Sequence, residues 1–429
     1  MISNLYPPYH DGGYELSCAD VMERLVGRGH EVTVLTSDRG LRHGRRMSAV
    51  PARSGDAPAR SAGAGGGRGR PAVMRRLRLY WEDGRLLSPP VPARLAIERA
   101  NRAALEDAMA AARPDVVSVW NMAAVSLGLL TAVAARGVPL VYVVCNDWLD
   151  WGPDMDAWMR LWRRRPAAGR AASRLTGLPT VVGDLGSSGT FCFVSDWTRR
   201  RAEDRSPWTF ADSTVVYSGI DATDFPMVDE SSADRPWRWR LLFVGRLDPD
   251  KGAHRAVEAL GRLPEEATLR ILGPGNDEQR AELWRLARSE GVEARVEIGV
   301  AERSALAAHY RSSDAFLFPS RWDEPFGLVP VEAMACGTPV VATGTGGSTE
   351  FLRHEGNCLL VPREDPGRLA EAVSALAADP GLRRKLAAGG RRTAAALTVD
   401  ALADCLEEWH VGAAAGFAGG RPADRVLPL

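Results

Sequence analysis

Short apolar runs alternate with longer stretches of helical periodicity along most of the chain. A strand usually has ~5–6 residues, whereas an amphipathic helix repeats its apolar positions every three or four residues over a longer stretch. Regular alternation of the two predicts parallel sheets covered by helices on both faces, the doubly wound α/β class. The runs that we expect to form strands are 31–36, 115–120, 139–144, 190–195, 238–245, 269–272, 295–298, 315–319 and 339–342. The stretches that we expect to form helices are 14–28, 97–112, 123–136, 196–205, 254–260, 301–312, 366–378, 382–396 and 399–409.

The first strand of this series is short. Only residues 2–4 precede the turn at 6–13, and a strand usually needs ~5–6 residues. We therefore expect the printed sequence to start part-way along its first strand. Gly12 and Gly13 end the turn just before the first helix, and glycines there let the backbone approach a ligand where a side chain would block it.

One further helix is predicted between the strands 315–319 and 339–342. Pro330 suits the first turn of a helix, where a missing N–H costs nothing, and Gly337 suits its C-terminal end. The helix should therefore start near Phe326.

The start of this helix is a candidate anion site. The amides of Gly327, Leu328 and Val329 would lack intrahelical partners, and a helix N-terminus attracts phosphate. Glu324 precedes the helix start, and Glu332 follows about two turns later at ~3.6 residues per turn. Two carboxylates would repel a phosphate, so we expect them to bind hydroxyls instead. A sugar on one side of a diphosphate and a ribose on the other would satisfy both, which predicts a nucleotide-sugar donor.

Two cations follow the strand 238–245. Arg246 directly follows this strand, and Lys251 lies in the turn that leads into the next helix. Both can therefore reach one anion at the carboxyl edge of a parallel sheet, where such sheets bind ligands. The chain has only two lysines, Lys251 and Lys385, against 52 arginines. A lysine in this turn therefore indicates a role that needs a compact ammonium, although nothing marks Lys385 as functional.

The segment EPFGLVPVEAMACGTPVVAT, in which seven residues separate two glutamates, resembles the donor-site motif of retaining glycosyltransferases of family 4. The opening NLYPPYHDGGYELSCADVMERLVGRGHEVTVLTS resembles the amino-terminal signature of the same family. The resemblance implies a GT-B fold, with two Rossmann-like doubly wound domains facing across a cleft and a C-terminal helix crossing back to the first. The domains would be 1–218 with a flexible insertion at 39–93, then 219–397, and finally 398–429.

The resemblance also implies roles for the candidate residues. Glu324 would bind hydroxyls of the donor sugar, Glu332 the ribose, and the 327–329 amides the phosphates. Arg246 and Lys251 would hold the leaving diphosphate.

Further contacts with the donor are implied at other turns. Gly12 and Gly13 would lie beside the donor phosphates and the reactive sugar. Gly273 would lie in a loop on the nucleotide side, and the backbone near Val300 would read the edge of the base.

The chain departs from the family pattern after the strand 139–144. Family members often carry a histidine there, near the donor sugar, whereas this chain has Cys145, Asn146 and Asp147. Either Asn146 or Asp147 takes over the hydrogen bond to a sugar hydroxyl, or the alignment shifts by one residue.

The function implied is sugar transfer from a nucleotide diphosphate sugar, of UDP or GDP type, with retention of anomeric configuration and with no metal or cofactor. The acceptor would be a small molecule, a glycan or a lipid-linked sugar, in bacterial glycan, glycolipid or specialised-metabolite synthesis. Three alternatives stay open. They are a nucleotide-sugar epimerase on the same fold, a non-catalytic sugar-nucleotide-binding protein, and a polyanion-binding protein that uses the arginine-rich insertion.

The charge and the aromatic residues of the first half are compatible with binding to an anionic partner. Residues 1–218 carry a net charge of +7 and the remainder −7. Residues 148–165 combine four tryptophans with three consecutive arginines, which suits sugar stacking, a membrane interface or simple packing. The six cysteines lack paired spacing, no run of ~18 apolar residues occurs, and no signal peptide opens the chain. We therefore expect a cytoplasmic protein, with peripheral contact at the inner face of the membrane as one option and no nucleic-acid partner.

Overall fold

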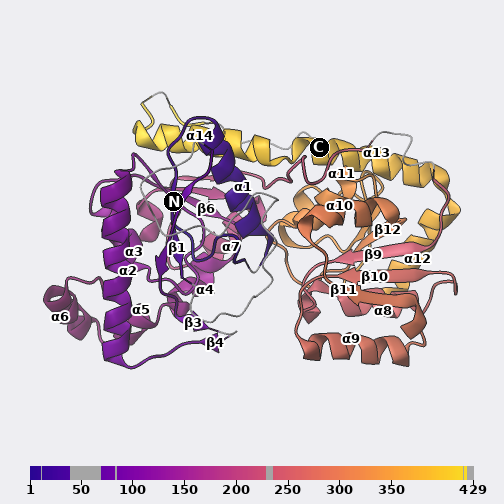
Figure 1. The fold of residues 1–429 in the computed structure, drawn as a ribbon, viewed down its shortest axis with the longest axis horizontal. Coiled ribbons are helices and arrows are strands. Elements are labelled where there is room, and N and C mark those ends of the chain that lie inside the picture. Colours follow the sequence, from indigo (N-terminus) through magenta and orange to yellow (C-terminus); the bar gives the residue numbers. More distant parts are fainter. Residues whose placement is uncertain (11, 39–68, 83–84, 229–234, 419, 423–429) are drawn as a thin grey trace. The chain divides into compact units, whose positions relative to one another are not determined.

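The computed structural model describes residues 1–10, 12–38, 69–82, 85–228, 235–418 and 420–422. The chain divides into two compact units. In Figure 1 the first runs from indigo to magenta and includes most of the yellow C-terminal helix, and the second runs from pink through orange to yellow. The first unit comprises Met1–Tyr217 and takes up the chain again from Leu402, and the second comprises Ser218–Ala401.

A parallel sheet lies at the centre of the first unit. Met1–Asn4 occupy a strand position inside it, because Ile2 bridges in parallel to Leu35 on one side and to Val119 on the other. In spatial order the named strands are β2 (Ala72–Leu77), β1 (Thr33–Ser37), β5 (Val117–Val119), β6 (Leu140–Val144), β7 (Thr190–Phe193) and β8 (Ser213–Val215).

Helices cover both faces of this sheet, and Figure 1 shows β1 between α1 and α2. Strands β6 and β7 are buried throughout, with Tyr142 stacked on Phe191 at 4.3 Å between ring centroids. Burial of such side chains contributes about 1.5–3 kcal/mol each. The helices are α1 (Gly13–Gly27), α2 (Val91–Ala112), α3 (Gly128–Ala134), α4 (Trp148–Met155), α5 (Ala157–Trp162), α6 (Pro166–Thr176), α7 (Asp196–Arg205) and α14 (Val399–Ala414), which begins in the second unit.

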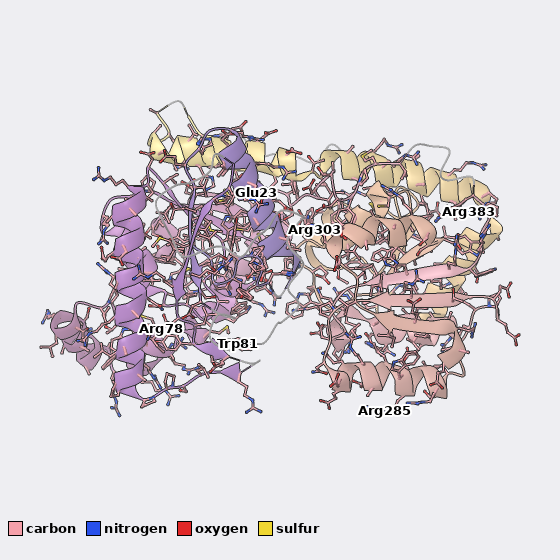
Figure 2. All side chains as sticks on the ribbon, in the orientation of Figure 1. Glu23, Arg78, Trp81, Arg285, Arg303 and Arg383 are labelled. Atoms are coloured by element: carbon pink, nitrogen blue, oxygen red, sulfur yellow. The ribbon has the colours of Figure 1, made fainter. Side chains whose placement is uncertain are left out.

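The segment expected to be a flexible insertion, 39–93, differs from that expectation where it is described. Residues 72–77 form β2, paired in parallel with β1, and Leu77 and Tyr80 are fully buried. Two short strands that pair antiparallel follow, β3 (Trp81–Glu82) and β4 (Arg85–Leu86), and Trp81 is labelled in Figure 2. Because β2 is an edge strand with one face exposed, it can carry arginines. Those arginines made the composition of this segment resemble that of a flexible loop. Residues 39–68 lie outside the described part of the chain.

The second unit contains a six-stranded parallel sheet. Its spatial order is β11-β10-β9-β12-β13-β14, so the chain starts in the middle, builds one edge, returns and builds the other. The order reverses between β9 and β12, and in such sheets ligands bind at the carboxyl ends of the strands on either side of that switch point. The strands are β9 (Arg240–Val244), β10 (Thr268–Leu272), β11 (Val296–Gly299), β12 (Ala315–Phe318), β13 (Val340–Ala342) and β14 (Leu359–Leu360).

In the described part of this unit, six α-helices surround the sheet. One of them, α9, was not predicted; six of its 13 residues are charged, and only Leu283 and Ala287 are buried. It forms nonetheless with a capping box in which Asn276 accepts from the Gln279 amide at 2.8 Å. The helices are α8 (Ala253–Leu260), α9 (Asp277–Ser289), α10 (Arg303–Ser312), α11 (Leu328–Ala335), α12 (Pro366–Ala378) and α13 (Pro380–Ala396).

Within the residues that the structure describes, no helix combines the length and the apolar character needed to cross a membrane.

Candidate functional site

The turns after β9 and β12 touch each other at the switch point of the second unit. Gly252 starts α8 in the left-handed region at φ 79°, and a Cβ there would lie 1.9 Å from the carbonyl oxygen of Pro319. Only glycine permits that approach. The backbone amides of Arg321 and Trp322 also donate to the carbonyl of Asp250, at 2.8 and 3.1 Å. The two turns therefore form one connected edge.

Lys251 and Glu324 meet on this edge. The Lys251 Nζ lies 2.7 Å from Oε1 and 2.9 Å from Oε2 of Glu324, and the Ser320 hydroxyl donates to Oε1 at 2.9 Å. The Glu324 side chain is 8% exposed and that of Lys251 20%, so the ion pair is largely shielded from solvent. Charge-assisted hydrogen bonds of this kind are stronger than neutral ones. The sequence predicted both charged residues but not Ser320.

Arg246 occupies the same turn but does not join this ion pair. Its guanidinium pairs with the Asp248 carboxylate at 3.0 Å, and its side chain is 54% exposed. An exposed ion pair contributes about 0–1 kcal/mol, so little energy is needed to redirect Arg246 toward an anion.

The helix that follows Glu324 starts slightly later than expected. Its first residue is Leu328, its N-cap is Gly327 in the left-handed region at φ 93°, and no side chain caps it. The amides of Leu328 and Val329 therefore lie in its first turn, where a helix offers donors to an anion. Phe326 anchors the entry by packing on Phe351, with 5.0 Å between ring centroids.

Glu332 lies on α11 and is held from α10. The hydroxyl of Tyr310 donates to its Oε2 at 2.8 Å, and Tyr310 itself is fully buried. Burial raises the pKa of Glu332, while the Tyr310 hydrogen bond and the charge of Arg303 act in the opposite direction. Arg303, labelled in Figure 2, is ion-paired with Asp224 at 2.7 Å. The sequence did not indicate either Tyr310 or Arg303.

The turns after β10 and β11 extend the same edge. A Cβ on Gly273 would lie 1.7 Å from the carbonyl oxygen of Gly245, so these two turns are in direct contact. Hydrogen bonds from Gly245 to Leu272 at 3.0 Å and from Gly273 to Gly299 at 2.9 Å join three consecutive strand ends. Val300, just beyond β11, is 57% exposed.

The remaining candidate residues lie at the carboxyl edge of the first unit's sheet. Gly12 is the N-cap of α1 in extended conformation, and its amide donates to Glu15 Oε2 at 3.0 Å. A Cβ there would meet only that Glu15 oxygen, at 3.6 Å, which is ordinary contact. Gly13 is exposed. Within the first unit neither backbone strain nor packing demands glycine at Gly12.

Asn146 and Asp147, after β6, both have partners within the first unit. Asn146 Oδ1 accepts from the Trp148 amide at 3.1 Å, and Asp147 Oδ2 accepts from Arg201 Nε at 2.9 Å. Asp147 is 7% exposed, and burial raises its pKa. Arg201 in turn lies over the Trp197 ring at 5.0 Å.

The tryptophans nearby are divided between core and surface roles. Trp148 and Trp158 are buried, and Trp158 Nε1 donates to the Pro179 carbonyl at 2.8 Å. These two pack the first unit. Arg164 and Arg165 are exposed, and Arg163 pairs with Asp154 at 2.6 Å.

A polar cluster that sequence reasoning missed fixes the turn before α1. Asn121 Nδ2 donates to the Tyr14 hydroxyl at 2.7 Å, and that hydroxyl donates to Asn4 Oδ1 at 2.9 Å. The one available signal was that Asn121 directly follows the predicted strand 115–120.

Across the described ranges, no group of three or more His, Cys, Asp or Glu side chains is placed to hold a metal ion. All six cysteines are free thiols, and all but Cys145 are buried.

Two family models match consecutive parts of the chain. Residues 11–224 match the model described as Glycosyltransferase Family 4, and residues 229–393 match the model described as Glycosyl transferases group 1.

Curated relatives match over shorter stretches. D-inositol 3-phosphate glycosyltransferase of Xylanimonas cellulosilytica is 40% identical over 211 residues, which is 45% of this chain and 50% of the relative. Glycogen synthase of Mycobacterium tuberculosis is 35% identical over 190 residues, which is 42% of this chain and 44% of the relative. The chain thus spans about half the length of the curated relatives that it matches.

Solved structures are similar over nearly the whole chain. Sucrose-phosphate synthase from Thermosynechococcus elongatus has a TM-score of 0.66 at 21% identity, covering 97% of this chain and 98% of that one. Anabaena Alr3699/HepE, solved in complex with UDP, has a TM-score of 0.62 at 19% identity, covering 95% of this chain and 97% of that one. At these identities the likeness shows the fold, which is GT-B. The two family models, in the order of the two units, show that the chain belongs to glycosyltransferase family 4.

Proposed function

We propose that the protein is a glycosyltransferase that moves a sugar from a nucleotide diphosphate sugar to an acceptor with retention of anomeric configuration. One observation carries the proposal. At the switch point of the second unit, a shielded Lys251–Glu324 pair lies on the turns beside the uncapped start of α11. Cation, carboxylate and free helix amides are the groups that a sugar joined to a diphosphate requires.

Each group would have a separate task. The diphosphate would take the amides of Leu328 and Val329 and share the Lys251 ammonium with Glu324. The Glu324 carboxylate, already oriented by Ser320, would accept from hydroxyls of the donor sugar. Glu332, oriented by Tyr310, would accept from the ribose.

The bond that breaks joins the anomeric carbon to the β-phosphate oxygen. Negative charge then develops on the departing phosphate, and Lys251, the α11 amides and a redirected Arg246 would stabilise it, because fixed donors are most effective where charge develops. The acceptor oxygen forms the new bond on the same face. Its proton passes to the leaving phosphate, which removes the need for a protein base. We propose that these cations and amides suffice without a metal ion.

We propose the identity of the donor and of the acceptor from what the similar proteins are named for or were solved with. Anabaena Alr3699/HepE was solved with UDP and with UDP-glucose, so we propose a UDP-type donor first and a GDP-type donor second. The named relatives include D-inositol 3-phosphate glycosyltransferase and glycogen synthase. A phosphorylated polyol and an α-glucan are therefore the first acceptors to try.

A thermal-shift panel tests the donor proposal. The full chain is heated with UDP, GDP, ADP, dTDP and their sugar conjugates, and a ligand at a hundred times its Kd should stabilise by roughly 2.7 kcal/mol. We expect a shift with one base, lost in Glu332→Ala. No shift with any nucleotide in the folded chain would contradict the donor proposal.

Product analysis tests the reaction itself. With the nucleotide identified, NMR of the product should show the anomeric configuration of the donor sugar on a new glycosidic bond. An inverted linkage would contradict retention. A donor converted to its epimer without acceptor would identify an epimerase, and a bound donor that is never consumed would identify a binding protein.

A further inference from the structure

The segment 221–228 of the second unit packs on α10, the helix that carries Tyr310. Phe225 is fully buried, and its ring meets the Tyr310 ring edge-on, with 6.1 Å between ring centroids. Edge-to-face contact is a favoured arrangement of two aromatic rings. Near the end of the helix, the Arg311 guanidinium donates to the Pro226 carbonyl at 3.0 Å. The segment is therefore held against α10 by apolar and polar contacts.

The same segment contacts α11 and is folded by its own hydrogen bonds. The Val228 amide donates to the Ala335 carbonyl of α11 at 3.3 Å. Asp221 Oδ1 accepts from the Thr223 amide at 2.8 Å, and the Asp221 carbonyl accepts from the Phe225 amide at 2.9 Å. An aspartate that bonds the backbone two residues later stabilises a tight turn. The turn thus sets the place of Phe225 on α10.

An ion pair joins this segment to the first residue of α10. Asp224 Oδ2 lies 2.7 Å from Nε of Arg303, which is labelled in Figure 2. The two side chains are only 14% and 19% exposed, and salt screens such a shielded pair less than a surface pair. The ion pair therefore fixes the position of the Arg303 charge.

These contacts converge on Glu332 of α11. Its Oε2 accepts from the Tyr310 hydroxyl at 2.8 Å, and Phe225 packs on that ring. Burial raises the pKa of Glu332, and the Tyr310 hydrogen bond lowers it. The charge of Arg303 also lowers this pKa, whereas the charge of Asp224 raises it. Both the direction and the ionisation of the carboxylate thus depend on residues that the segment holds.

We propose that Phe225 and Arg303 are positioning residues for Glu332, which keep its carboxylate ionised and aimed at the ribose of a nucleoside diphosphate. Phe225 acts through the Tyr310 hydroxyl, and Arg303 acts through its charge. The inference rests on the proposed donor site, because Glu332 can meet a ribose only if a nucleotide binds beside α11.

The pH dependence of nucleotide binding tests the role of Arg303. The full chain, Arg303→Met and Arg303→Lys are titrated with UDP from about pH 5 to about pH 8, a range above the ordinary pKa of a glutamate. In Arg303→Met the Asp224 charge stays and raises the pKa of Glu332 unopposed. As the pH is lowered, binding should therefore fail about one pH unit higher than in the parent. Arg303→Lys keeps the charge and should restore the parent profile.

A matched control removes an arginine elsewhere in the second unit. Arg368 of α12 is ion-paired with Glu371 at 2.8 Å, and Arg368→Met should keep the parent profile. A parent profile in Arg303→Met, accompanied only by a lower Tm, would show a purely structural ion pair and overturn the role of Arg303. A full chain that binds neither UDP nor any other nucleotide would contradict the proposed function, and this inference with it.

A double-mutant cycle tests the role of Phe225. Phe225→Leu should weaken UDP binding roughly three- to fivefold at neutral pH, because the Tyr310 hydroxyl is then less well placed. In the Tyr310→Phe background the same substitution should have no further effect. The control is Phe210→Leu in the first unit, where Phe210 meets Phe191 edge-on at 4.7 Å, and it should leave the affinity unchanged. An equal loss in both backgrounds would overturn the role of Phe225, and this cycle still decides if Arg303→Met fails to fold.

Discussion

The carboxyl edges of the two sheets are built in different ways. In the second unit, turns touch backbone to backbone, and a Cβ on Gly252 or Gly273 would lie within 2 Å of a carbonyl oxygen. In the first unit, a backbone hydrogen bond from Asn4 to Asn121 at 2.8 Å joins two turns, and side chains add the Asn121–Tyr14 and Arg201–Asp147 hydrogen bonds at 2.7 and 2.9 Å. Backbone contact fixes a site whatever the neighbouring side chains are, whereas side-chain contact changes with each substitution.

The largest difference in stability should appear when one methyl group is added to a glycine at each edge. Gly273→Ala places a Cβ 1.7 Å from the Gly245 carbonyl, so we expect a loss of about 4 kcal/mol or more in unfolding free energy. In Gly12→Ala the added methyl group would meet no close atom, and we expect the unfolding free energy to stay within about 0.5 kcal/mol of that of the parent. Urea unfolding of both variants measures the difference. Similar losses at the two positions would remove the contrast between the edges.

A smaller effect is expected from the buried charge of the first unit. Asp147→Asn leaves Arg201 without its carboxylate, and we expect a loss of about 1–2 kcal/mol in unfolding free energy. The affinity for nucleotide should not change, because the donor-binding groups that we propose lie in the second unit. Urea unfolding and nucleotide titration on the same variant check both statements. A large drop in nucleotide affinity would indicate that Asp147 takes part in donor binding.

The smallest effect on stability should come from Tyr310→Phe, whose signature is a change in pH dependence. Without the hydroxyl, the pKa of Glu332, already raised by burial, should rise further. The ribose needs the ionised carboxylate, so as the pH is lowered binding should fail at a higher pH than in the parent. We also expect roughly five- to tenfold weaker nucleotide binding at neutral pH.

A matched control for this prediction is Tyr142→Phe. That hydroxyl is also buried and hydrogen-bonded, to Ser188 at 2.7 Å, but in the first unit. Its loss should leave the pH profile of nucleotide binding unchanged. Equal profiles for the parent and Tyr310→Phe would show that Tyr310 does not orient Glu332.

The sequence predicted the elements whose signals are local. The α/β alternation, the turn that carries Lys251 and the helix start after Glu324 all lie within short segments, so spacing was enough to place them. The pairing of Lys251 with Glu324 joins residues 73 positions apart, and only the three-dimensional structure brings Ser320 to the same carboxylate.

The features that the sequence could not predict depend on partners far away in the chain or on strands without a clear alternation of apolar and polar residues. Tyr14 contacts Asn121, 107 positions away, and no periodicity reports such a contact. Strand β2 has exposed and half-buried positions until Leu77, so its residues lack a clear alternation. Asp147 was a candidate for a sugar hydroxyl, and its pairing with Arg201 depends on a helix that follows 49 residues later, at Asp196.

The most direct test of the account uses the two lysines of the chain. Lys251 contacts Glu324 at 2.7 Å, whereas Lys385 is 58% exposed and lies 3.9 Å from Glu355, so each can be replaced by alanine with only one affecting the proposed donor site. Calorimetric titration of the full chain with the nucleotide diphosphate found in the panel gives the affinity of each variant. The account predicts at least a tenfold weaker affinity in Lys251→Ala, with Lys385→Ala equal to the parent. Equal affinities in both folded variants would contradict a donor site at the switch point of the second unit.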